Sequence, residues 1–411
     1  MLRFRTYLTE VVNNKNTHLE HLEDSVLNGG VDGTREAINF LRAIRDMLAG
    51  EAKSSVNITV KFDGAPAVFA GIDPNDGQFF VAKKGIFNKN PKVYKTPEEI
   101  DADTSGDLNS KMKLALEHLP ALGIKGVVQG DFLYSREDIK EVDIDGEPHI
   151  TFHPNTIVYA IPKKSELAKE ILRSRIGVVW HTTYRGDSFE TMRASFGEEI
   201  ASNLKKTQEV WSVDAVYRDI SGSATFTEKE TEEVTRLLSQ AGKLFRKLDR
   251  KTLNGISNHP ERLMRVKTYV NSKVREGQRI KDTKKFVEGL IDYINEYYGK
   301  EEAKRKSEKG KETQRQKRDD VLSFFNDTDT RDLKTMFDMY NLIVDAKLII
   351  VKKLDKAKRI NTLLLTPNGY EVTGQEGFVA IDHTGENAVK LVDRLQFSYA
   401  NFSPEIIKGF H

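Results

Sequence analysis

Ile58-Thr59-Val60-Lys61-Phe62-Asp63-Gly64 is the stretch from which the fold of this 411-residue chain can be read outward. Apolar and polar residues alternate from Val56 to Phe62, which is typical of a half-buried strand. The Asp63-Gly64 pair then predicts a turn, since this dipeptide favours tight hairpins. Residues 67–72 and 78–83 predict the next two strands. An antiparallel β-structure therefore begins near residue 56.

Four further motifs follow in order, each in or beside a predicted strand. They are Gly130-Asp131, Val158-Tyr159, Glu376-Gly377-Phe378-Val379 and Val389-Lys390-Leu391. Each has an ordinary structural explanation when taken alone: a turn, a core aromatic residue or a lysine on an edge strand. The combination of all of them in this order is more specific than any one motif.

The rest of the chain predicts an α+β fold. Helical spacing recurs in residues 1–50, 107–119 and 165–173, and a long helical stretch runs from about 227 to 358, with Thr227 as its N-cap. Strand patterns resume at 362–365, 376–382 and 388–391. We therefore expect antiparallel sheets with helices, interrupted by a large helical insertion. The expected segments are an N-terminal helical part (1–55), a first β-rich part (56–226), a basic helical insertion (227–358) and a C-terminal part (359–411).

This order of motifs resembles the covalent nucleotidyltransferase superfamily, which comprises ATP-dependent DNA and RNA ligases and mRNA capping guanylyltransferases. The resemblance covers roughly residues 56–185 and 360–400. It implies a ligase-type nucleotidyltransferase domain in which Lys61 attacks a nucleoside triphosphate and carries the nucleoside monophosphate on its side-chain nitrogen. It further implies ATP and Mg²⁺ or Mn²⁺ as cofactors.

The resemblance also implies a role for each motif residue. Lys61 is the nucleophile, and Asp63 and Gly64 complete its motif. The backbone near Thr59 and Val60 contacts the purine, and Tyr159 stacks on it. Lys84 contacts ribose or phosphate, and Asp131 binds the ribose or a metal. Glu376 is linked to the metal, and Lys390 binds phosphate and assists catalysis.

A lysine nucleophile must be neutral to attack phosphorus, although its usual pKa is about 10.4. Burial or neighbouring cations can lower that pKa, and we expect Lys83, Lys84 and Lys390 to be those cations. Mg²⁺ beside a triphosphate calls for carboxylates, which Asp131 and Glu376 would provide. His149, His153 and His181 lack metal-ligand spacing and are expected to be ordinary core or surface residues.

The sequence departs from the superfamily in several places. Asp131 stands where glutamate is usual, and Ala388 and Val392 flank Lys390 where a second lysine is usual. The helical insertion before Glu376 is atypical, and only 21 residues follow Lys390, too few for an OB-fold domain. The lack of an OB-fold-sized segment favours an RNA ligase-like enzyme over a DNA ligase or a capping-type guanylyltransferase. Asp131 and the missing second lysine favour the alternative, a non-catalytic nucleic-acid-binding or virion protein on a decayed ligase fold.

Composition narrows the function classes. The chain has no cysteine, which excludes disulfides, zinc ribbons and cysteine nucleophiles, and no apolar run approaches the roughly 20 residues of a membrane helix. The net charge is only +2, yet residues 229–318 hold 25 Lys/Arg against 14 Asp/Glu. This asymmetry predicts that the insertion contacts nucleic acid, with a solvated, charged helical bundle as the alternative. The resemblance to RNA ligases implies RNA in preference to DNA. Its aromatic residues Tyr269, Tyr293, Tyr297 and Tyr298 are candidates for base stacking, with core packing as the alternative.

The first residues suggest an origin. Phe4-Arg5-Thr6-Tyr7-Leu8-Thr9-Glu10 resembles the leaders that direct proteins into the heads of large tailed phages, where a head protease would cut after Glu10. An ordinary helical turn is the alternative. The expected location is the host cytoplasm, with packaging in a phage head as a further possibility.

Overall fold

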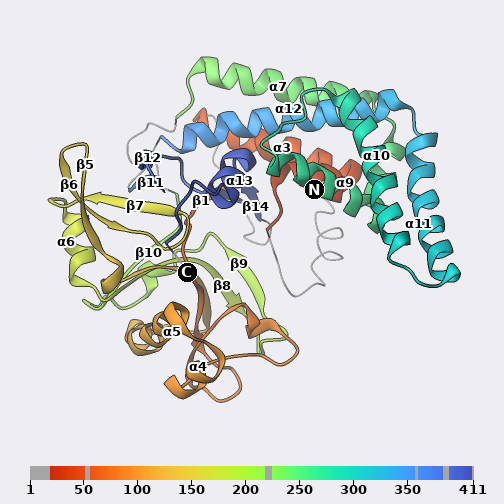
Figure 1. Cartoon of the computed structure of the whole chain (residues 1–411). Coiled ribbons are helices and arrows are strands. Elements are labelled where there is room, and N and C mark those ends of the chain that lie inside the picture. Colours follow the sequence, from red (N-terminus) through yellow and green to blue (C-terminus); the bar gives the residue numbers. More distant parts are fainter. Residues whose placement is uncertain (1–18, 51–55, 218–224, 357–359, 383–387, 410–411) are drawn as a thin grey trace.

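A computed structural model of the chain describes residues 19–50, 56–217, 225–356, 360–382 and 388–409 (Figure 1). The leader-like residues 4–10 lie outside these ranges. Three mainly antiparallel sheets and a set of helices make up the described part. Strands β1 and β14 and helix α13 lie between the β-rich side and the helical side (Figure 1). No helix in these ranges is long and apolar enough to cross a membrane.

The first sheet joins the two ends of the β-rich part. Its strands are β1 (Val56–Lys61), β13 (Gly377–Asp382) and β14 (Ala388–Leu391), in the order β1-β13-β14. All pairs are antiparallel, with Lys61 opposite Gly377 and Val379 opposite Lys390. The expected completion of the β-rich part by the C-terminal strands is therefore confirmed, and it places three of the sequence motifs on one small sheet.

The second sheet carries Asp131. Its order is β10-β8-β4-β2-β3, and β9 pairs with β8; all pairs are antiparallel except β8 with β10. The strands are β2 (Ala67–Ile72), β3 (Phe79–Ala82), β4 (Val127–Ser135), β8 (Ile176–Arg185), β9 (Arg193–Phe196) and β10 (Val210–Asp214). Helices α4 (Pro97–Asp103) and α5 (Gly106–His118) flank it, and Met112 and Ala115 of α5 share a core with Val68 and Phe132.

The third sheet carries Tyr159. Its order is β12-β11-β7-β6-β5, from β5 (Lys140–Ile144), β6 (Glu147–Phe152), β7 (Ile157–Pro162), β11 (Asn361–Thr366) and β12 (Gly369–Val372). Ser165 is the N-cap of helix α6 (Glu166–Arg173), and its side chain accepts a hydrogen bond from Ala168 N. Because β11 pairs with β7, this sheet also joins the segments before and after the helical insertion.

Nine α-helices lie on the helical side within the described residues. They are α2 (Ser25–Asn28), α3 (Gly30–Leu48), α7 (Glu228–Lys247), α8 (Arg250–Ser257), α9 (Pro260–Arg275), α10 (Thr283–Ala303), α11 (Glu308–Asp327), α12 (Thr330–Leu354) and α13 (Arg394–Phe402). Thr227 is the N-cap of α7, as predicted, and it forms a reciprocal capping box with Glu230. Short 3₁₀ turns occur at η1 (Leu22–Asp24), η2 (Lys84–Phe87), η3 (Leu119–Leu122), η4 (Arg136–Asp138) and η5 (Ala201–Asn203).

One hydrophobic core connects the N-terminal helix, the insertion and the first sheet. Leu41 and Ile44 of α3 are buried with Leu238 of α7 and Ile343 of α12, and the same cluster includes Phe378 of β13. Helix α12 lies against β14 and α3 lies against β1, so these two helices join the helical side to the sheet that holds Lys61. The mixed α+β architecture with antiparallel sheets is as predicted.

A buried ionic cluster fixes the segment just before α2. Both carboxylate oxygens of Glu23 accept from Lys347 Nζ of α12, at 2.7 and 2.8 Å, and both side chains are 1% exposed. Asp24 accepts from Arg394 of α13 at 2.9 Å. The backbone N–H of Lys390 donates to the carbonyl of Glu20 in this segment at 2.9 Å. The N-terminal segment therefore links the helical side to the strand that carries Lys390.

Candidate active site

Lys61 ends β1, and its ammonium group forms an ion pair with the carboxylate of Glu376, the residue directly before β13. The pairing of Lys61 with Gly377 brings these two motifs together from distant parts of the chain. Glu376 is 8% exposed and Lys61 is 30% exposed. The lysine is therefore held by a nearly buried carboxylate while part of it still faces solvent.

The loop after Lys61 is fixed by hydrogen bonds to Asp63. Its carboxylate accepts from Asn155 Nδ2, Thr156 N and Ile157 N, each at 2.8 Å. Its own backbone N–H donates to the hydroxyl of Tyr159 at 2.7 Å. A buried carboxylate with several donors is strongly held in place, so Asp63 positions the end of β1 rather than reacting.

Gly64 brings this loop against the second sheet. A Cβ atom at Gly64 would lie 2.5 Å from Cβ of Asp131, which leaves no room for any side chain. Asp131 is on β4, opposite Ala67 of β2 and Val179 of β8. The Lys61 motif and the Asp131 motif are therefore in direct contact.

His181 of β8 also belongs to this site. Its Nε2 lies 3.8 Å from a carboxylate oxygen of Asp131, and its Nδ1 lies 2.7 Å from Thr182 Oγ1. Gln129 is paired with Thr182 and Gly130 with Trp180, so His181 is the extra residue of a β-bulge. His181 was expected to be an ordinary core or surface residue, and the structure places its partly exposed side chain beside Asp131.

The charges around Lys61 do not make it neutral. Burial alone would lower the pKa of Lys61, but Glu376, Asp131 and Asp63 outweigh it and the pKa is raised. Burial raises the pKa of Asp131 and that of Glu376 to about 7, and Lys61 opposes both shifts. The excess of carboxylates therefore favours protonation throughout the site. This corrects the expectation of a lowered pKa for Lys61.

The other lysines are placed differently from one another. Lys83 is bound to Asp103 at 2.9 Å, so it does not act on Lys61. Lys84, the first residue of η2, is exposed and acts on Asp131 through its charge. Lys390 is half-buried on β14, and burial followed by the charge of Lys61 lowers its pKa. Of the three expected cations, Lys390 is the one whose charge interacts with that of Lys61. The charge of Lys84 acts on Asp131 instead.

Two expected base contacts are not available in this structure. Tyr159 is fully buried between Phe62 and Phe152, with ring centroids at 5.8 and 5.4 Å, so it has no exposed face for stacking. The N–H of Val60 donates to the carbonyl of Ala215 at 2.7 Å, and Thr59 is 5% exposed. Tyr159 instead supports Asp63, and these β1 residues pair with neighbouring backbone.

The tyrosines of the helical insertion are likewise core residues. Tyr269 and Tyr298 are 9% and 2% exposed, and Tyr293 and Tyr297 pack against the same core. Arg265 lies over the ring of Tyr297, 3.7 Å from its centroid. The structural alternative for these four residues, core packing, is the one observed.

Asp131 and Glu376 fit a divalent cation that arrives with phosphate. Within the described ranges, no group of three or more His, Cys, Asp or Glu residues could hold a metal ion alone. Mg²⁺ is commonly bound by one or two carboxylates, with substrate phosphates and water as the remaining ligands. Two carboxylates with raised pKa values beside a single lysine have the charge that such an ion would offset. The residues present therefore fit Mg²⁺ bound together with a triphosphate.

Asp131→Asn should stabilise the metal-free protein at alkaline pH. The pKa of Asp131 is about 7 when folded against 3.8 ordinarily, so its contribution to the free energy of unfolding is full below pH 4 and is lost as the pH rises through 7. Removing the charge of Asp131 should therefore raise the free energy of unfolding by about 4 kcal/mol at pH 8 and by little at pH 4. Urea unfolding in EDTA at both pH values measures this. Exposed Asp292→Asn is the control, and an equal effect of the two variants would contradict the prediction.

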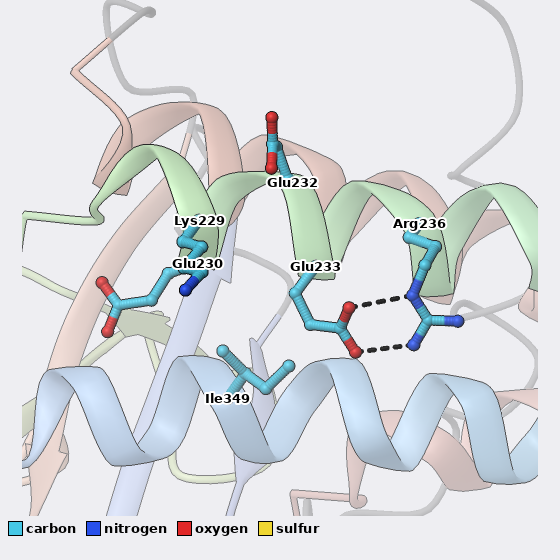
Figure 2. Close-up of a pocket in the computed structure, with 6 residues that line it drawn as sticks. All are labelled: Lys229, Glu230, Glu232, Glu233, Arg236 and Ile349. Carbon is cyan, nitrogen blue, oxygen red and sulfur yellow. Dashed lines mark hydrogen bonds and ion pairs between the residues drawn. The ribbon is translucent and has the colours of Figure 1, made fainter.

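A separate groove lies on the helical side, away from these residues. Figure 2 shows it between α7 and α12, lined by Lys229, Glu230, Glu232, Glu233, Arg236 and Ile349. Glu233 and Arg236 pair with each other at 2.6 Å across the surface of α7. The groove contains none of the motif residues.

Sequence reasoning therefore found Lys61, Asp63, Gly64, Asp131, Glu376 and Lys390 as neighbours, and it missed His181 and Asn155. No sequence signal marks a bulge, and Asn155 is recognisable only once Asp63 is seen beside it. A model of a protein family described as "Family of unknown function (DUF6267)" matches residues 16–406. No curated protein and no solved structure matches the chain.

Proposed function

The chain belongs to this family of unknown function, and we propose from its own residues that it is a covalent nucleotidyltransferase of the RNA ligase-like kind. One observation carries the proposal: the ion pair of Lys61 with Glu376, beside Asp131 and within electrostatic reach of Lys390. A nucleophile, two carboxylates and a phosphate-binding cation are what transfer of a nucleotide to lysine requires.

In the first step, Nζ of Lys61 forms a bond to the α-phosphorus of ATP. The bond from that phosphorus to the bridging oxygen breaks, and pyrophosphate leaves with the electron pair. The proton of Lys61 passes to Glu376, which it contacts and whose pKa of about 7 suits a proton acceptor at neutral pH. Glu376 passes it on to solvent water and is then ionised again. Lys390 and Lys84 stabilise the charge of the departing pyrophosphate. Mg²⁺, held by Asp131 and Glu376, would supply further charge neutralisation.

In the later steps, AMP passes from Lys61 to a 5′-phosphate end, and a 3′-hydroxyl then displaces AMP to form the phosphodiester bond. RNA is the expected acceptor because of the resemblance to RNA ligases. The basic helices α7–α11 share one hydrophobic core with the sheet that holds Lys61 and would bind the phosphate backbone.

Self-labelling tests the proposal. The protein is incubated with Mg²⁺ and ATP or GTP labelled on the α-phosphate, and then run on a denaturing gel. A band with ATP that pyrophosphate removes, and that is labile to acid but stable to alkali, is the expected result for a lysine phosphoramidate. ATP labelled on the γ-phosphate is the control and should give no band.

A second candidate is a non-catalytic nucleic-acid-binding protein on the same architecture, such as a virion protein. The raised pKa of Lys61 and the buried ring of Tyr159 favour it. Absence of label with either nucleotide, in Mg²⁺ and in Mn²⁺, would support this candidate and refute the enzyme. Binding of RNA that is unaffected by ATP would complete the case.

A further inference from the structure

His181 is placed at the site by an irregularity of the sheet. The register between β4 and β8 shifts after Gln129, and His181 is left without a partner on β4. A bulge interrupts the ladder and turns a side chain in a new direction, and bulges are frequent beside active sites. Here the side chain is turned so that Nε2 faces Asp131, while both neighbours, Trp180 and Thr182, are buried.

The contact between the two side chains is incomplete. At 3.8 Å, Nε2 of His181 and the carboxylate oxygen of Asp131 are too far apart for a direct hydrogen bond. An oxygen atom can lie about 2.8 Å from both at once, which is the usual hydrogen-bond distance for such groups. Both side chains keep some exposure, 25% for His181 and 19% for Asp131, so neither is fully enclosed by the core.

The chemistry of the pair fits a hydroxyl group. Thr182 Oγ1 lies 2.7 Å from Nδ1 of His181, and the carboxylate of Asp131 faces Nε2. In the tautomer in which Nδ1 accepts a hydrogen bond from the threonine hydroxyl, Nε2 carries the proton and is a donor. A hydroxyl between the two residues would donate to the carboxylate of Asp131 and accept from Nε2–H. A phosphate oxygen would suit the histidine but would be repelled by the carboxylate.

We propose that His181 is a further nucleotide-binding residue, which together with Asp131 binds one ribose hydroxyl of the nucleoside triphosphate. The inference rests on the proposed function and deepens it. The nucleotide that lacks this hydroxyl, either the 2′-deoxy or the 3′-deoxy form, should then bind more weakly than the ribonucleotide. A site built to hydrogen-bond a hydroxyl is left with unpaired groups when the hydroxyl is missing.

The test compares ATP, 2′-deoxyATP and 3′-deoxyATP as donors for self-labelling. In the wild type, the half-saturating concentration of one deoxynucleotide should exceed that of ATP by about tenfold or more. His181→Ala should raise the half-saturating concentration of ATP about tenfold and change that of the same deoxynucleotide by less than about twofold. His181→Gln, which keeps an amide donor, should retain part of the selectivity. His118→Ala, on α5 outside the site, is the control and should behave as the wild type.

Other outcomes overturn the inference. These are an equal effect of His181→Ala on ATP and both deoxynucleotides, no effect at all, or a changed Mg²⁺ requirement without a change in nucleotide selectivity. If His181→Ala does not fold, judged by its thermal unfolding, the comparison is made with His181→Gln and His181→Asn. Labelled wild type with unchanged His181 variants refutes this inference alone, whereas unlabelled wild type refutes the proposed function and this inference with it.

Discussion

Lys61→Arg should abolish covalent labelling while leaving the protein folded. Arginine keeps the positive charge that Glu376 requires, but its guanidinium group does not lose a proton under physiological conditions and cannot attack phosphorus. We expect the rate of labelling to fall by at least about a thousandfold, as when a nucleophile is removed. The measurement is the amount of label from α-phosphate-labelled ATP on a denaturing gel, with thermal unfolding as the check on folding.

The matched control is Lys163→Arg, the same change at an exposed lysine whose partner is Glu141. It should label as the wild type does. Label that persists in Lys61→Arg would contradict the assignment of the nucleophile. In that case Lys390, half-buried with a lowered pKa, is the next residue to replace.

Lys61→Ala is a different experiment and should not be used alone. It removes the nucleophile but also leaves Glu376 without its partner in a nearly buried position. A carboxylate in that state is costly, so loss of activity could then reflect a change in structure. The arginine variant separates the charge of Lys61 from its reactivity.

Much of the fold follows from local pattern. The alternation from Val56 to Phe62 predicted β1, and the spacing in residues 107–119 predicted α5 to within one residue. Thr227 and Glu230 predicted the start of α7 because a capping box is a local interaction. The pairing of β1 with β13 could not come from pattern, since it joins strands separated by most of the chain. The order of the motifs was the only evidence that these strands meet.

The site was predictable as a set of residues but not as an electrostatic arrangement. Lys61, Asp131 and Glu376 are brought together as the motif order implied. Whether neighbouring lysines or carboxylates dominate the pKa of Lys61 depends on distances of a few ångströms, which no sequence pattern specifies. The same holds for Tyr159, whose hydroxyl accepts from Asp63 while its ring is enclosed by the core. An aromatic residue on a strand has the same signature in either role.

The contribution of the N-terminal segment was also not predicted. Glu23 and Asp24 belong to none of the sequence motifs, yet they are buried against Lys347 and Arg394. Burial raises the pKa of Glu23, but Lys347, His21 and Arg394 together outweigh that effect and the pKa is lowered. The stability that this pair provides should therefore be present at neutral pH and lost as the pH falls through the acid range.

Lys347→Met should be among the most destabilising single changes in the chain. It leaves the Glu23 carboxylate buried without its main partner, and breaking a buried pair in this way typically costs about 3–5 kcal/mol. Urea unfolding at pH 7 measures the change in the free energy of unfolding. Lys334→Met is the matched control, since it makes the same substitution on the same helix in an exposed pair with Asp338, and it should cost less than about 1 kcal/mol.

The double variant Glu23→Gln with Lys347→Met separates the two reasons for that loss. If the cost comes from an unpaired buried charge, removing the charge should recover about half of it or more. If the double variant is as unstable as Lys347→Met, the loss comes from packing around Lys347 instead. Equal costs at Lys347 and Lys334 would contradict the prediction itself. Because the same segment accepts the N–H of Lys390 through Glu20, a loosened pair should also slow labelling by Lys61 before the protein unfolds.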